Sequence, residues 1–184
     1  MKKSYLILAA AAIGALTVAA SPYRDLADRP IKAMSPEKID ALNTGKGAGY
    51  ALVAELNGYP GPRHVLDMAS ELALTENQLS TTRDLFSRMQ AEAIRLGKSI
   101  IIGERQLEEL FRARKISEAE LFRLTEDIAK TESRLRATHL KYHLEMVNIL
   151  SNEQVIAYDR LRGYHAAGEK HQPGTGHFHG PRDP

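Results

Sequence analysis

Two long stretches of the sequence carry small or apolar residues in steps of three and four, which is the spacing of one face of an α-helix. The first stretch follows Thr75 and places these residues at Leu79, Thr82, Phe86, Met89, Ala93, Leu96, Ile100, Gly103, Leu107 and Leu110. The second follows Ser117 and repeats the pattern, with one irregular step near Glu145, at Leu121, Leu124, Ile128, Thr131, Leu135, Thr138, Tyr142 and Ile149. Each stretch therefore predicts an amphipathic helix of roughly thirty residues, on the order of 50 Å long.

Only a short connection, residues 113–116, separates the two predicted helices. A connection of this length favours packing of the two helices as an antiparallel hairpin. The alternating pattern that is typical of strands is missing from the sequence. We therefore predict an all-α fold, built on a long antiparallel helical hairpin with short flanking helices.

Three pairs of polar residues indicate where helices begin. In each pair a Ser or Thr precedes a Gln or Glu by three positions, and the pairs are Thr75 and Gln78, Ser117 and Glu120, and Ser151 and Gln154. This spacing is typical of a capping box, in which the hydroxyl accepts a hydrogen bond from a backbone N–H of the first turn and the later side chain accepts one in return. We expect a helix to begin at each pair.

Shorter helices are predicted upstream of the first long one. Ser35 followed by Pro36 favours a helix start and Gly45 favours its end, because proline suits the first helical position and glycine the left-handed terminal one. The Gly- and Pro-rich residues 57–62 predict a break. After it, residues 63–73 predict a helix whose apolar face carries Val65, Ala69 and Leu72.

The N-terminus has the pattern of a secretory signal. Lys2-Lys3 precedes an uncharged run at residues 4–20, which ends in Val18-Ala19-Ala20, small residues at the positions that a signal peptidase reads. The apolar part is about 15 residues long, shorter than the roughly 20 that a membrane-spanning helix needs. We expect export to the periplasm with cleavage before Ser21, and an uncleaved anchor is the alternative.

The sequence after Tyr164 lacks apolar periodicity and is rich in Gly, Pro and His. We interpret residues 165–184 as a disordered tail that follows a last helix ending near Gly163. The tail contains His165, His171, His177 and His179. It is either a solvated segment or a weak scavenger of divalent metal.

Composition argues against several functional classes. Loss of residues 1–20 lowers the Lys and Arg count from 25 to 23, equal to the 23 acidic residues, so the mature chain is neutral and implies no nucleic-acid partner. The sequence has no cysteine, which excludes disulfides and thiol nucleophiles. Residues 44–49 lack the spacing of a Walker motif, and neither a nucleophile elbow nor an HExxH motif is present. We therefore expect no catalytic residues and no enzyme activity.

A leucine precedes two of the capping boxes, giving Leu74-Thr75-Glu76-Asn77-Gln78 and Leu150-Ser151-Asn152-Glu153-Gln154. Together these segments resemble the paired LTxxQ motifs of the Spy/CpxP family of periplasmic stress proteins, over roughly residues 63–164. The motif residues are then Leu74, Thr75, Gln78, Leu150, Ser151 and Gln154. The chain departs from the family pattern in its neutral charge, since the chaperones of the family have a basic concave face. It also has Ser151 in place of the second Thr, and Ser caps a helix equally well.

The resemblance implies a four-helix protomer that forms a curved antiparallel homodimer. Some family members are ATP-independent chaperones, others act in envelope-stress signalling, and a related branch comprises periplasmic heavy-metal sensors and zinc-resistance proteins. The implied organisation is a signal peptide at 1–20, an N-terminal segment with short helices at 21–61, an LTxxQ-type helical domain at 62–164 and the tail at 165–184.

The first interpretation of function is a chaperone or stress adaptor that binds unfolded envelope proteins or reports to a membrane-bound sensor. Its surface would be a second stripe on the first long helix, formed by Leu85, Ile94, Ile101 and Ile102 with Arg88 and Arg95. The three consecutive isoleucines at 100–102 point in three directions, so a two-helix seam buries only some of them. A dimer interface is the alternative role of this surface.

The second interpretation is a periplasmic metal-binding or sensing protein. His139 and His143 are four positions apart and share one helical face. His64 and Met68 have the same spacing, with Glu71 one turn further on. If the chain reverses just before the first long helix, both groups lie at the same height along the helix axis. They would then form one mixed site for zinc, copper, nickel or cobalt. The alternatives are that His139 belongs to the hydrophobic seam and that His64 lies on an ordinary helix surface.

Overall fold

The structure is a computed structural model and describes residues 23–164. In this range all regular secondary structure is helical. The prediction of an all-α chain with a long helix pair is therefore confirmed. The predicted signal sequence at residues 1–20 and the predicted tail at residues 165–184 lie outside the described residues.

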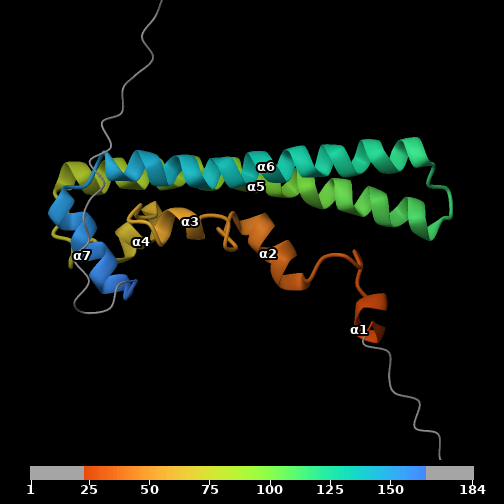
Figure 1. Cartoon of the computed structure of the whole chain (residues 1–184), viewed down its shortest axis with the longest axis horizontal. Helices are drawn as coiled ribbons and strands as arrows, with labels where there is room; N and C mark the ends of the chain where they lie inside the picture. Colours follow the sequence, from red (N-terminus) through yellow and green to blue (C-terminus); the bar gives the residue numbers. More distant parts are fainter. Residues whose placement is uncertain (1–22, 165–184) are drawn as a thin grey trace, which may run out of the picture.

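The two longest helices, α5 (Glu76–Arg112) and α6 (Glu118–Val147), lie side by side and form the body of the molecule (Figure 1). They run in opposite directions, since the side chain of Gln78 at the start of α5 bonds to the carbonyl of Ile149, which follows the end of α6. In the half of the pair nearer the connection, the helices approach closely at Gly103, where an added Cβ would lie 2.8 Å from the Cγ1 atom of Ile128.

The predicted helix starts are confirmed by their hydrogen bonds. At Thr75 the hydroxyl accepts from the backbone N–H of Gln78 over 3.2 Å, and the backbone N–H of Thr75 donates to Gln78 Oε1 over 3.0 Å. Ser117 and Ser151 form the same capping box at the starts of α6 and α7 (Asn152–Arg162). These local sequences therefore determine where the three helices begin.

Four short helices precede the long pair and run along one side of it (Figure 1). They are α1 (Arg24–Ala27), α2 (Pro36–Thr44), α3 (Leu52–Glu55) and α4 (Pro62–Asp67). As predicted, α2 is capped by Ser35, has proline at its first position and ends at Gly45 in the left-handed conformation. It crosses α5 at Gly97, where an added Cβ would lie 2.3 Å from the carbonyl oxygen of Leu42.

The helix predicted over residues 63–73 is too long. In the structure α4 ends at Asp67, and turns with a left-handed Ala73 lead to the start of α5. This path buries Leu72 and aims its carbonyl at the Nε2 atom of Gln154, which donates to it over 3.1 Å. Tertiary packing at the end of the helix pair therefore overrides the local helical pattern.

Two hydrophobic clusters connect the short helices to the long pair. The first joins the N-terminal segment to the middle of α5 and α6 through Ile31, Met34, Leu42, Ala93, Leu96, Ile100, Ile101, Ile128 and Leu135. The second lies at the end of the pair where α4 and α7 pack, and contains Val65, Leu72, Leu85, Met89, Tyr142, Met146, Leu150 and Tyr158. Of the helices between residues 23 and 164, none is long and apolar enough to cross a membrane.

The surface predicted from the second stripe of α5 is largely covered. Leu85 and Ile101 are only 2% and 7% exposed, because the second cluster contains Leu85 and the first contains Ile101. Ile94 is half-buried beneath Gly45, whereas Ile102, Arg88 and Arg95 are exposed. The prediction that Leu85 and Ile101 belong to an exposed stripe is wrong, since the N-terminal segment packs on the face of α5 that the seam with α6 leaves open.

Candidate functional site

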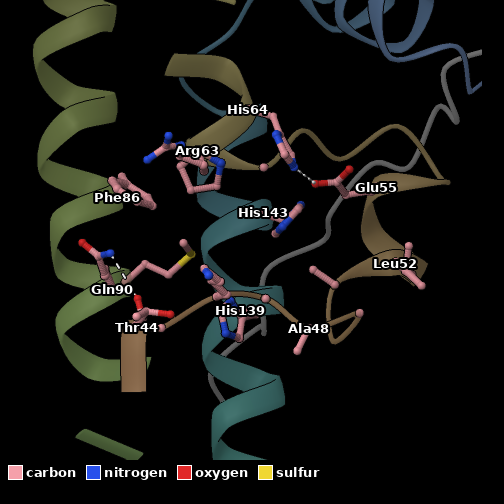
Figure 2. A pocket seen from close by; sticks show the side chains of 18 of the residues that line it. Thr44, Ala48, Leu52, Glu55, Arg63, His64, Phe86, Gln90, His139 and His143 are labelled. Carbon is pink, nitrogen blue, oxygen red and sulfur yellow. Dashed lines mark hydrogen bonds and ion pairs between the residues drawn. The ribbon is translucent and has the colours of Figure 1, made fainter. Parts of the chain in front are cut away.

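A cavity of about 550 Å³ opens where the N-terminal segment crosses the long helix pair (Figure 2). Its walls come from the loop at residues 44–49, from α3 and the start of α4, and from facing stretches of α5 and α6. Phe86, Met89 and Gln90 line it from α5. Arg162 and Tyr164, at the end of α7, complete the wall.

His143 projects from α6 into this cavity with its ring orientation fixed (Figure 2). Its Nδ1 atom lies 2.7 Å from the carbonyl oxygen of Tyr59. Because a carbonyl only accepts, Nδ1 carries the hydrogen and Nε2 of the neutral ring keeps its lone pair. Burial lowers the pKa of His143, against the opposing effects of the Tyr59 carbonyl and Glu55, so the ring is neutral at neutral pH.

The Nε2 atom of His143 and the carboxylate of Glu55 face the same small space beside Gly61. A Cβ added to Gly61 would lie 3.2 Å from that Nε2 atom and 2.8 Å from Glu55 Oε1. No side chain larger than hydrogen fits at this position without displacing one of the two groups. The glycine therefore keeps open the space between the imidazole and the carboxylate.

His139 lies one turn before His143 on α6 and is 2% exposed. Its ring stacks on Tyr50 with the ring centroids 6.0 Å apart and an angle of 14° between the planes. Its Nε2 atom is buried and has no hydrogen-bond partner. Burial, followed by the neighbouring His143, lowers the pKa of His139. The cavity wall therefore holds a neutral imidazole with an unused nitrogen, which is uncommon because buried polar atoms are usually paired.

Glu55 connects α3, α4 and the end of α7. Its Oε1 atom lies 3.9 Å from Nε2 of His64, while its Oε2 atom accepts a hydrogen bond from the hydroxyl of Tyr164 and lies 3.6 Å from Nη2 of Arg162. Burial, followed by the bond to Glu55, raises the pKa of Tyr164, so its hydroxyl stays protonated and donates. The carboxylate is therefore mostly engaged by groups of the chain itself.

The structure brings three of the five residues suggested as metal ligands to one cavity. His64, His139 and His143 all line it. Met68 packs against the second hydrophobic cluster and Glu71 is exposed, and neither lines the cavity. Met68 caps the C-terminus of α4 and Glu71 lies beyond it, so the structure does not bring these two residues to the cavity with His64.

Sequence reasoning missed Glu55 and Met89 as lining residues. Met89 had been assigned to the apolar seam of α5, and Glu55 lies in a segment without periodicity, so no pattern indicated that either would face the histidines. Between residues 23 and 164 no group of three or more His, Cys, Asp or Glu side chains is placed to hold one metal ion. Any ion in this cavity would therefore use fewer such ligands or require a side chain to move.

No protein-family model, curated protein or solved structure matches this chain. The resemblance to the Spy/CpxP family therefore rests on the two LTxxQ-like segments and their setting. In the structure Leu150 is buried in the second cluster and Leu74 packs against it, while Thr75 and Ser151 cap their helices. The motif residues hold one end of the helix pair together, and none of them lines the cavity.

Proposed function

We propose that this protein binds a transition-metal ion in the periplasm and that the cavity is the binding site. The observation that carries the proposal is the meeting of three imidazoles from α4 and α6 on one cavity wall. Two of them are buried and have lowered pKa values, so their nitrogens do not have to lose a proton before binding a metal.

His143 has a hydrogen bond to a backbone carbonyl of the kind that is typical of a metal-binding histidine. Such residues usually donate the ring N–H that faces away from the metal to a carbonyl or carboxylate, which fixes the tautomer. Here the carbonyl of Tyr59 accepts from Nδ1 and leaves Nε2 free for an ion. His139 contributes a second imidazole one turn away, and the side chain of His64 is 39% exposed, so it has room to rotate toward them.

A binding assay on the exported chain tests this proposal. The four tail histidines are first replaced by serine, as His165→Ser, His171→Ser, His177→Ser and His179→Ser. Any metal binding that is then measured comes from the histidines between residues 23 and 164. Calorimetry with copper, zinc, nickel and cobalt should show binding by at least one ion, weakened at least tenfold by His143→Ala. Equal affinity for every ion in the two proteins would contradict the proposal.

The periplasmic location and the partners belong to the same proposal. The signal-like pattern of residues 1–20 supports export, and detection of a mature N-terminus at Ser21 in the envelope fraction tests it. The LTxxQ-like segments support a homodimer and a role upstream of a membrane-bound sensor.

A chaperone or stress adaptor is the second candidate function. The observation in its favour is a set of large apolar side chains exposed on the far part of the helix pair, namely Ile102, Phe111 and Phe122, at 65%, 52% and 66%. Exposed apolar surface of this kind binds unfolded chains or a second copy of the protein. Suppression of client aggregation in the absence of added metal would support this function.

A further inference from the structure

We propose that the cavity is selective for a soft monovalent ion, Cu(I) in the cell and Ag⁺ as its analogue, over Zn²⁺, Ni²⁺ and Co²⁺. This inference rests on the proposed metal-binding function and names the ion that the site selects. Three properties of the cavity support it: the kind of donor atoms, their number and the surrounding charge.

The donors that line the cavity without another partner are soft or intermediate. Met89 supplies a thioether from α5 and is 6% exposed. His139 and His143 supply neutral imidazoles from α6 (Figure 2). Thioether ligands select Cu(I), and imidazole also suits copper. The hard donor, Glu55, is already engaged by the Tyr164 hydroxyl and faces Arg162, so it is poorly available to a hard dication.

The number of ligands also favours Cu(I). Zinc in proteins usually has at least three protein ligands from His, Cys, Asp and Glu. The described part of the chain places no three such side chains around one point. Cu(I) forms stable complexes with only two or three soft ligands, so the histidine pair on α6 with Met89 is sufficient for it.

The charge around the cavity disfavours a dication. The cationic lining residues Lys46, Arg63 and Arg162 pair with Asp40, Asp67 and Glu55, and among the described residues that line the cavity Glu55 is the only carboxylate. The cost of moving an ion from water into a protein interior rises with the square of its charge, so a dication costs about four times as much as a monovalent ion of equal radius. A cavity whose one lining carboxylate is already engaged therefore discriminates against Zn²⁺, Ni²⁺ and Co²⁺ more strongly than against Cu(I).

The test measures affinities for Cu(I), Ag⁺, Zn²⁺, Ni²⁺ and Co²⁺ under anaerobic conditions, using competing chelators of known affinity. The protein is the mature full-length chain with its four tail histidines replaced by serine. We expect Cu(I) and Ag⁺ to bind at least a hundredfold more tightly than any of the dications. A dication that binds more tightly than Cu(I) would overturn this inference and leave the proposed function standing.

A pair of methionine variants tests the donor assignment. Met89→Leu should weaken Cu(I) binding at least tenfold, because it removes the thioether while keeping a side chain of similar volume. Met34→Leu is the matched control, since Met34 is equally buried in the first cluster but does not line the cavity. Equal Cu(I) affinity in both variants would overturn the inference, and failure of every ion to bind would overturn the proposed function with it.

Discussion

Gln78 and Gln154 exchange side-chain hydrogen bonds although 76 positions separate them in the sequence. Gln78 Nε2 donates to Gln154 Oε1 over 2.8 Å, and Gln154 Nε2 donates to Gln78 Oε1 over 3.1 Å. Each oxygen also accepts the backbone N–H of its own cap residue, Thr75 or Ser151. Each glutamine side chain therefore caps its own helix and also bonds to the segment where the other helix begins.

This dual role explains why both LTxxQ-like segments contain glutamine. The third capping box uses Glu120, whose carboxylate accepts from Ser117 and contacts no second helix start. A carboxylate can cap a helix but has no hydrogen to donate. The amide nitrogens of Gln78 and Gln154 also donate to the carbonyls of Ile149 and Leu72, so only an amide satisfies all four acceptors.

We predict that Gln78→Glu destabilises the protein although it keeps a capping residue. The carboxylate would face Gln154 Oε1 and the carbonyl of Ile149, so the carbonyl would lose this donor and Gln154 Oε1 would keep only the N–H of Ser151. The expected loss is about 1–3 kcal/mol in the free energy of unfolding, measured by urea denaturation. Glu120→Gln is the control and should change stability little. Equal effects of the two substitutions would show that the glutamine pair adds nothing to capping.

Gly97→Ala should separate α2 from the helix pair. In an isolated helix this change stabilises by about 1 kcal/mol, but here the new methyl group would lie 2.3 Å from the carbonyl oxygen of Leu42. Since backbone cannot rotate away, we expect a net loss of about 1–3 kcal/mol in unfolding free energy. Ser99→Ala, on the exposed side of α5, is the control. A stabilised Gly97→Ala protein would contradict the close crossing of α2 over α5.

Stability should fall as the pH is lowered below about 6.5, where free imidazoles protonate. Burial holds the pKa values of His139 and His143 below that value in the folded state, so the unfolded chain binds protons first. The stabilisation is complete above pH 6.5 and is lost progressively as the pH approaches the lowered folded pKa values.

Urea denaturation between pH 8 and pH 5 in the presence of a chelator measures this dependence. His139→Phe keeps a ring stacked against Tyr50 and removes one of the two groups, so its stability should depend less steeply on pH. The same slope in both proteins would mean that His139 protonates equally well in the folded and unfolded states.

Two adjacent isoleucines should respond differently to the same substitution. Ile101→Ser should lower the unfolding free energy by about 2–5 kcal/mol, because the side chain is buried in the first cluster. Ile102→Ser should leave stability nearly unchanged, since this side chain is 65% exposed. If the exposed patch forms a dimer or binds clients, Ile102→Ser will reduce the mass measured by light scattering or the suppression of aggregation. No change in either would leave the patch without a role.

The helix pair could be predicted from the sequence because its signals are local. Capping boxes at Thr75, Ser117 and Ser151 and a three-four spacing depend only on neighbouring residues. The covering of α5 could not be predicted, because Ile31, Met34 and Leu42 belong to segments too short for their apolar pattern to indicate which helix they pack on. Their packing is determined by the shape of the α5 surface, above all by Gly97.

The cavity could be predicted only in part, for a similar physical reason. The pair of histidines on α6 follows from helical spacing. The position of His64 at the same height along the helix axis follows from the reversal of the chain before α5. Glu55 and Tyr164 reach the cavity through turns and through the last helix. Side chains placed by tertiary contacts of this kind carry no sequence period that would indicate them.

The hydrogen bond between Tyr164 and Glu55 joins residues 109 positions apart and spans most of the described chain. Synthesis from the N-terminus produces Glu55 and His64 long before Tyr164, and His139 and His143 shortly before it. Until Tyr164 arrives, one wall of the cavity is missing and the carboxylate lacks a donor. A chain truncated before Tyr164 therefore contains Glu55 and the three histidines without the last wall of the cavity.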